Sequence, residues 1–158
     1  MAYKVFISHS TQDRGLVISL ANLLSKFGAD VLVAEWYLAP SDQLEKKISG
    51  QIENANCVVV LLTKHGVRSS WMQQEIGYAL KSGNPIIPLV EKGSDEADLG
   101  PLRGKEYIEY DPRRPEAALL QTSSYVRKLN LEKEEREKAL LIAGGILAFL
   151  LLLSGGKE

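Results

Sequence analysis

The sequence predicts an α/β fold of the flavodoxin-like class, a five-stranded parallel sheet with helices on both faces. Two observations predict it. Short apolar runs, the middle ones β-branched and almost continuously apolar, alternate with apolar stripes at helical spacing. Strands that alternate with helices imply right-handed crossovers and a parallel sheet. Five such units favour the strand order 2-1-3-4-5 without proving it.

Five strands are predicted, and a helix is predicted after each of the first three. The strands cover residues 4–8, 30–34, 57–63, 85–90 and 107–110. The first two helices are marked by stripes of Leu16, Leu20, Leu23, Leu24 and Phe27, and of Leu44, Ile48 and Ile52. Gly28 is suited to end the first helix. The third helix covers residues 71–80; Ser70 and Gln73 form a capping-box pattern at its start, and Gly83 and Pro85 end it.

The C-terminal part has a different composition. Residues 115–138 predict a long polar helix, and residues 139–153 carry no charge. At about 1.5 Å per residue this apolar run spans roughly 22 Å, short of a hydrocarbon core of ~30 Å. We therefore expect a domain at 1–128, a charged helical linker at 129–138 and a membrane-associated helix at 139–156.

Three interpretations of the apolar tail stay open: a single-pass anchor in a locally thinned bilayer, a helix packed against a partner or its own copies, and an interfacial helix. The lack of a polar stripe counts against the interfacial helix. Basic residues precede the tail and only Lys157 follows it, which favours a cytoplasmic domain. Those basic residues are Arg127, Lys128, Lys133, Arg136 and Lys138.

Composition excludes several classes of protein. Basic and acidic residues are almost balanced, 19 against 20, so no nucleic-acid partner is expected. Cys57 is the single cysteine, which excludes an intramolecular disulfide and predicts an inert buried thiol. The N-terminus does not resemble a secretory signal. The chain shows no phosphate-binding glycine loop, serine-hydrolase elbow, receiver-type acidic pair or metal-ligand spacing, so no metal is expected.

A site is expected beyond the carboxyl ends of the first and third strands, where the connections diverge. The loops there, residues 8–13 and 64–70, are rich in hydroxyl groups and contain both histidines, His9 and His65. Trp71 and Glu75 lie four residues apart on the following helix and therefore share one of its faces. A carboxylate and an aromatic ring would then lie beside this edge.

Each of these residues also has a purely structural explanation. Glu75 would stabilise the positive end of its helix, and Trp71 would be an apolar plug. Ser10 with Asp13 would be a helix cap. His9 would only donate or accept hydrogen bonds, and His65 has no evident partner. From the residues alone, the sequence predicts a sheet, a crevice and candidate polar side chains, but no reaction.

Three motifs in the right order resemble the Toll/interleukin receptor (TIR) domain family, over roughly residues 3–125. Residues 4–10, followed by Asp13, resemble the first conserved box of that family. Residues 34–42 resemble its BB loop, with Pro40-Ser41 in place of the usual Pro-Gly, a departure that bears on the shape of the loop. Residues 69–75 are similar to its Ser-x-Trp-x-x-x-Glu motif, and residues 85–89 match its fourth strand.

The resemblance implies one of two functions. Some TIR domains are adaptors that assemble with other TIR domains; others cleave NAD as a substrate, need no cofactor, and use the glutamate that is Glu75 here. For the enzyme, the resemblance implies NAD contacts and a self-assembly surface in the BB loop. The NAD-binding candidates are Ser8, His9, Ser10, Asp13, Trp36 and Trp71, and the BB-loop candidates are Leu38, Pro40 and Ser41.

We therefore expect a membrane-tethered TIR enzyme, an NAD hydrolase or cyclase, in immune or stress signalling. Its partners would be NAD, other TIR domains and the membrane. The main alternative is a non-catalytic adaptor, which would tolerate loss of the Glu75 carboxylate. A TIR virulence factor is a third interpretation, and it needs a secretion route that the sequence does not show.

Overall fold

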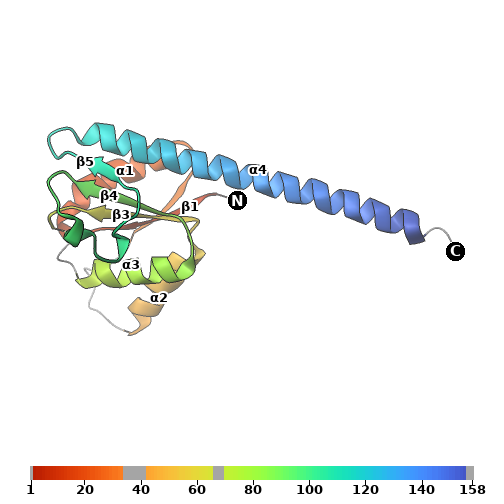
Figure 1. Cartoon of the computed structure of the whole chain (residues 1–158), viewed down its shortest axis with the longest axis horizontal. Helices are drawn as coiled ribbons and strands as arrows, with labels where there is room; N and C mark the ends of the chain where they lie inside the picture. The colour runs from red at the N-terminus through yellow and green to blue at the C-terminus, as the bar shows by residue number, and fades with distance from the viewer. Residues whose placement is uncertain (1, 34–41, 66–69, 156–158) are drawn as a thin grey trace. The chain divides into compact units, whose positions relative to one another are not determined.

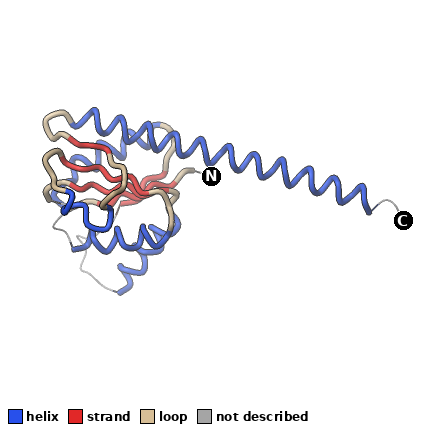
Figure 2. The backbone as a smooth tube through the Cα atoms, in the orientation of Figure 1, coloured by secondary structure: helices blue, strands red, loops and turns tan. Residues whose placement is uncertain are grey.

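In the computed structural model, which describes residues 2–33, 42–65 and 70–155, the chain forms a five-stranded parallel sheet (Figure 2). The strand order is β2-β1-β3-β4-β5, which confirms the predicted order. The strands are β1 (Lys4–Ser8), β2 (Asp30–Val33), β3 (Cys57–Leu62), β4 (Ile86–Glu91) and β5 (Ile108–Tyr110). All four pairings are parallel, so the carboxyl ends of the strands share one edge of the sheet.

Helices cover both faces of the sheet. The helices are α1 (Arg14–Lys26), α2 (Asp42–Asn54), α3 (Ser70–Ser82) and α4 (Pro115–Gly155), with 3₁₀ helices η1 (Thr11–Asp13) and η2 (Glu96–Leu102). Helices α2 and α3 lie on one face, and α1 and the start of α4 lie on the other (Figure 1). This arrangement confirms the predicted fold class.

The core beneath α2 and α3 follows from the alternation of side chains along the strands. Val58, Val60 and Leu62 of β3 join this cluster, so the intervening residues of β3 face the other layer. Every residue of β3 is buried, as its continuous apolar run predicts. The buried members of the cluster are Phe6, Ile48, Ile52, Ala55, Val58, Val60, Leu62, Met72, Ile76, Ala79, Val90, Leu99 and Leu102.

The predicted glycine at the end of the first helix has the expected conformation. Gly28 follows α1 with φ of +88°, which glycine adopts without steric cost. The amide of Ala29 then donates to the carbonyl of Leu24 at 3.3 Å, so a carbonyl of the last helical turn gains a partner.

The sequence did not predict η2, in the connection from β4 to β5. Gly100 interrupts it with φ of +51° and Pro101 follows, so the segment has no helical periodicity that a sequence pattern would show. Its start is fixed by a capping box, in which the amide of Asp95 donates to the carboxylate of Asp98 at 3.1 Å. The short element fills part of the core through Leu99 and Leu102.

The chain divides into two compact units, residues 1–124 and 125–158. Helix α4 runs from Pro115 to Gly155 without interruption, so the predicted polar helix and apolar segment are parts of one helix. The helix is long and apolar enough to cross a membrane, judged by length and composition alone. The large apolar side chains of residues 140–153 are exposed.

Candidate active site

The expected site lies where β1 and β3 end side by side. Ser8, the last residue of β1, pairs with Val60 of β3. From β1 the chain passes to β2 on one side, and β3 lies on the other, so the connections diverge at this point of the edge. In open α/β sheets, ligands bind beyond the carboxyl ends of the strands at such a divergence.

Glu75 of α3 is the only acidic side chain in the buried polar set of the described residues. It lies among Met72, Ile76 and Ala79, which form the buried face of α3, and it is 0% exposed. Burial raises the pKa of Glu75 and the Ser8 side chain lowers it by a smaller amount, so that the pKa is about 8 instead of its ordinary value of 4.5. A carboxyl at a core-facing position costs free energy when it ionises, and this is typical of functional acids.

Ser8 and Glu75 are therefore brought together, as predicted, from elements far apart in the sequence. Ser8 is fully buried at the end of β1, and it interacts with the Glu75 carboxyl across the layer between β1 and α3. The alternation of β1 explains the contact. Phe6 packs into the cluster beneath α2 and α3, and Ser8, two residues further, points to the same face.

His9, directly after β1, is half-buried, and its ring orientation is set by the backbone. Its Nδ1 lies 2.6 Å from the carbonyl oxygen of Ser10. A carbonyl only accepts hydrogen bonds, so Nδ1 carries the proton and donates it. In the neutral ring, Nε2 is then an acceptor; it is buried and has no hydrogen-bond partner among the described residues.

The structural explanation of Ser10 is confirmed. Its hydroxyl accepts a hydrogen bond from the Gln12 amide at 3.3 Å, which caps η1. Asp13 differs from the expected cap: its side chain makes no cap hydrogen bond, and its Oδ2 instead accepts from the Thr63 hydroxyl at 2.6 Å. That bond connects the loop after β1 with the end of β3. It can form because the two strands are neighbours in the sheet.

Trp71 is half-buried at the start of α3 and packs against the core cluster beneath that helix. This position agrees with the structural explanation of Trp71 as an apolar plug. Trp71 also lies one helical turn before Glu75. Trp36, Leu38, Pro40 and Ser41 lie outside the described residues.

Sequence reasoning missed three polar residues at this edge. The Glu91 carboxylate, at the end of β4, accepts a hydrogen bond from the Lys64 amide, and Thr63 binds Asp13. The pKa of Tyr110, at the end of β5, is raised by burial and then by the nearby carboxylates of Glu91, Asp13 and Asp111. Glu91 and Tyr110 are the last residues of their strands, and Thr63 directly follows β3. Their position at strand ends was the sequence signal that could have identified them.

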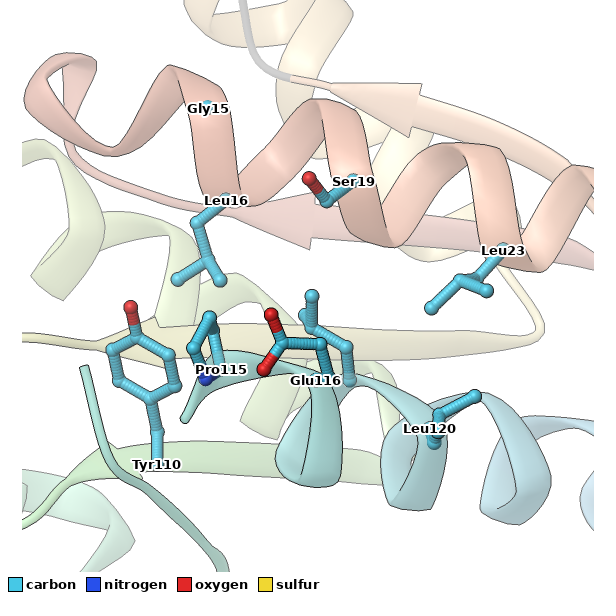
Figure 3. A pocket seen from close by; sticks show the side chains of 9 residues that line it. Gly15, Leu16, Ser19, Leu23, Tyr110, Pro115, Glu116 and Leu120 are labelled. Carbon is cyan, nitrogen blue, oxygen red and sulfur yellow. The ribbon is translucent and has the colours of Figure 1, made fainter. Parts of the chain in front are cut away.

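A separate hollow of about 440 Å³ lies between α1 and the start of α4 (Figure 3). Its walls are mainly apolar, with the carboxylate of Glu116 and the hydroxyl of Tyr110 among them. The lining residues are Gly15, Leu16, Ser19, Leu23, Tyr110, Pro115, Glu116, Leu119 and Leu120. Because α1 and the start of α4 cover the face opposite α3, this hollow is distinct from the surroundings of Glu75.

Comparison with known proteins gives matches over most of the chain. The model of the TIR domain family matches residues 5–140. The protein named 2' cyclic ADP-D-ribose synthase BtTIR, from Bacteroides thetaiotaomicron, is 35% identical over 126 residues, which are 77% of this chain and 41% of that protein. Probable 2' cyclic ADP-D-ribose synthase TcpB, from Brucella abortus (strain 2308), is 31% identical over 97 residues, 58% of this chain and 39% of that protein. The chain thus spans about two fifths of these relatives.

A solved structure shows the same fold. The TIR domain of the Toll-related receptor TRR-2 from Hydra magnipapillata superposes with a TM-score of 0.63 at 20% sequence identity. The match covers 80% of this chain and 99% of that one.

Proposed function

The chain belongs to the TIR domain family, and we propose that it cleaves NAD at the bond between nicotinamide and ribose, with Glu75 as the catalytic carboxylate. The products would be nicotinamide and either ADP-ribose or a cyclic form of it. One observation carries the proposal: a fully buried carboxyl on α3 meets Ser8 at the carboxyl end of β1. The names of the two bacterial relatives, both cyclic ADP-ribose synthases, support it.

The departure of nicotinamide needs little from the protein besides this carboxylate. Nicotinamide leaves NAD as a neutral molecule, so its departure needs no proton donor. One carboxylate then suffices, whereas most glycosidases use a pair. Glu75 would hold the ribose hydroxyls and stabilise the positive charge that develops on the ribose in the transition state.

The ionisation of Glu75 fits a substrate with a cationic nicotinamide ring. With its pKa raised to about 8, the carboxyl is mostly protonated at neutral pH in the ligand-free chain. The positively charged nicotinamide ring of NAD would favour the ionised form, because an opposite charge nearby lowers a carboxyl pKa. Substrate binding and ionisation of the acid would thus support each other.

The remaining predicted residues would serve binding and assembly. We assign NAD contacts to Ser8, His9 and Trp71, and also to Trp36. Ser10 and Asp13 would act indirectly, because their side chains hold the loop that carries His9. In the BB loop, Leu38, Pro40 and Ser41 would contact a second TIR domain.

Helix α4 suits a membrane tether. Residues 1–128 would form the catalytic domain, 129–138 a charged linker and 139–156 a membrane helix with the domain on the cytoplasmic side. The exposed apolar side chains of residues 140–153 support this part of the proposal, because so much apolar surface is costly in water. Confinement of several copies to one membrane would raise their effective concentration and favour assembly.

The experiment is NAD turnover by the full-length chain in liposomes, with nicotinamide and the ADP-ribose species separated. We expect turnover by the wild type and a loss of about 10²-fold or more in Glu75→Ala. Glu53→Ala, an exposed acid on α2, is the matched control and should keep full activity. Absence of turnover by the wild type at high density on liposomes would contradict the proposal and favour the non-catalytic adaptor.

A further inference from the structure

The unused acceptor on His9 is a buried polar atom for which the fold provides no partner among the residues that the structure describes. A buried acceptor without a donor destabilises the fold, so such an atom needs an explanation. The ring does not turn away from this position, because its Nδ1–H group is held by the Ser10 carbonyl at 2.6 Å. The lone pair of Nε2 therefore remains available to accept a hydrogen bond or a proton.

His9 directly follows the residue that interacts with Glu75. Ser8 and His9 are consecutive, so their Cα atoms lie about 3.8 Å apart. The Ser8 side chain interacts with the Glu75 carboxyl. The imidazole thus lies at the same end of β1 as the carboxylate to which we assign stabilisation of the ribose cation.

Three other polar groups at this edge already accept hydrogen bonds within the fold. The Asp13 carboxylate already accepts the Thr63 hydroxyl, and the Ser10 hydroxyl caps η1. The Glu91 carboxylate accepts the Lys64 amide. His65, the second histidine, is exposed in the turn after β3. Among the described residues at this edge, His9 is the basic group whose acceptor is still available.

We propose that His9 is the general base of the second half-reaction, accepting the proton of the hydroxyl group that attacks the ribose. This inference rests on the proposed function. In the first step the bond between ribose C1′ and the nicotinamide nitrogen breaks, and its electron pair leaves with neutral nicotinamide. In the second step an oxygen lone pair, from water or from a second ribose hydroxyl, forms the new bond to C1′. The proton of that hydroxyl moves to Nε2 and then to solvent.

The two kinds of nucleophile give a direct test. An attacking water or ribose hydroxyl must lose a proton, but a pyridine nitrogen has none to lose. We would incubate the full-length chain in liposomes with NAD, with and without 3-acetylpyridine, and measure hydrolysed or cyclised product and exchanged dinucleotide separately. In His9→Gln, whose amide oxygen accepts a hydrogen bond but takes up no proton, we expect product formation from hydroxyl nucleophiles to fall about 10²-fold or more. Exchange with 3-acetylpyridine should fall much less, so the ratio of exchanged dinucleotide to hydrolysed or cyclised product should rise by about tenfold or more.

Two further variants separate chemistry from structure. In His9→Asn, the side-chain amide takes the place of Nδ1 and keeps the donor to Ser10, but Nε2 is lost; it should behave like His9→Gln. His65→Gln is the matched control and should resemble the wild type in both reactions.

Several outcomes would overturn the base role. An equal loss of both reactions in His9→Gln would show that His9 only positions the site, and unchanged hydrolysis or cyclisation would show that another group takes the proton. If the wild type cleaves NAD but does not exchange the base, a rescue experiment replaces the exchange test. Added imidazole should restore hydrolysis or cyclisation of NAD to His9→Ala. Failure of that rescue would contradict the proposal. A wild type that neither releases nicotinamide nor exchanges it would contradict the proposed function itself.

Discussion

Glu75 shows how a residue that looks ordinary in the sequence becomes unusual in the structure. Its place in the first turns of α3 is also that of a common surface acid that stabilises a helix. The structure instead buries it completely among Met72, Ile76 and Ala79. Since burial raises its pKa to about 8, the acid reduces the stability of the fold above the pH at which it would ionise in the unfolded chain.

We predict that Glu75→Gln stabilises the protein at high pH. Because the folded pKa of Glu75 lies above its ordinary value of 4.5, wild-type stability is fully present below about pH 4.5 and falls as the pH rises to about 8. The variant lacks this loss, which is on the order of 3–5 kcal/mol. Thermal unfolding of the full-length chain at pH ~9 should show a Tm higher by roughly 10 °C. At pH ~4 the two Tm values should coincide; a difference that does not depend on pH would contradict the burial argument.

The sequence predicted which candidate residues lie at this edge of the sheet better than it predicted their contacts. The hydroxyl cap by Ser10 follows a local rule, and it was predictable. The bond from Thr63 to Asp13 joins residues 50 positions apart, and the His9 ring is oriented by a carbonyl whose direction only the folded backbone sets. Contacts of this kind depend on which strands become neighbours, and composition and spacing do not contain that information.

At the scale of the elements, the strands and helices were predictable because periodicity and composition agree. The apolar run of β3 predicted a strand buried on both faces, and Gly28 predicted the end of α1. Strand ends differed from the prediction by about one residue; β3, for example, ends at Leu62, one residue before the predicted end at Thr63. The 3₁₀ helix η2 was missed because a short element with Pro101 inside it has no repeat.

We predict opposite effects for alanine at two glycines. Gly28 has φ of +88°, so Gly28→Ala would force an L-residue into a left-handed conformation and cost about 1–2 kcal/mol. Gly50 lies inside α2, and an added Cβ there would meet open space. Gly50→Ala should therefore stabilise the fold by roughly 0.5–1 kcal/mol. Chemical unfolding would measure the free energy of unfolding of both variants. A stabilising Gly28→Ala would contradict the role of Gly28 in ending α1.

At the scale of the whole molecule, the strand order was the step that the sequence favoured without proving. The order β2-β1-β3-β4-β5 is confirmed, and it brings the ends of β1 and β3 together. The catalytic proposal depends on this adjacency, because Ser8 of β1 and Glu75 of α3 are far apart in the sequence. The tail was predictable as one apolar helix, since its composition has no polar stripe.

We predict that the apolar half of α4 binds membranes and raises activity. The full-length chain should co-float with liposomes and resist washing with high salt, because apolar burial is insensitive to salt. A chain that ends at Leu129 should remain unbound, and at equal total concentration its NAD turnover should be lower by about 10²-fold or more. Equal turnover by the shortened chain would contradict the role of the tether in assembly.

The central claim is that the ionised Glu75 carboxylate cleaves NAD, and the pH dependence of nicotinamide release tests it most directly. For the wild type, kcat/KM should rise about tenfold per pH unit below the raised pKa of Glu75 and level off above about pH 8, because kcat/KM reports the ionisation of the free enzyme. Glu75→Gln should release no nicotinamide at any pH. Turnover that does not change between pH ~6 and pH ~9, or that survives in Glu75→Gln, would contradict the account.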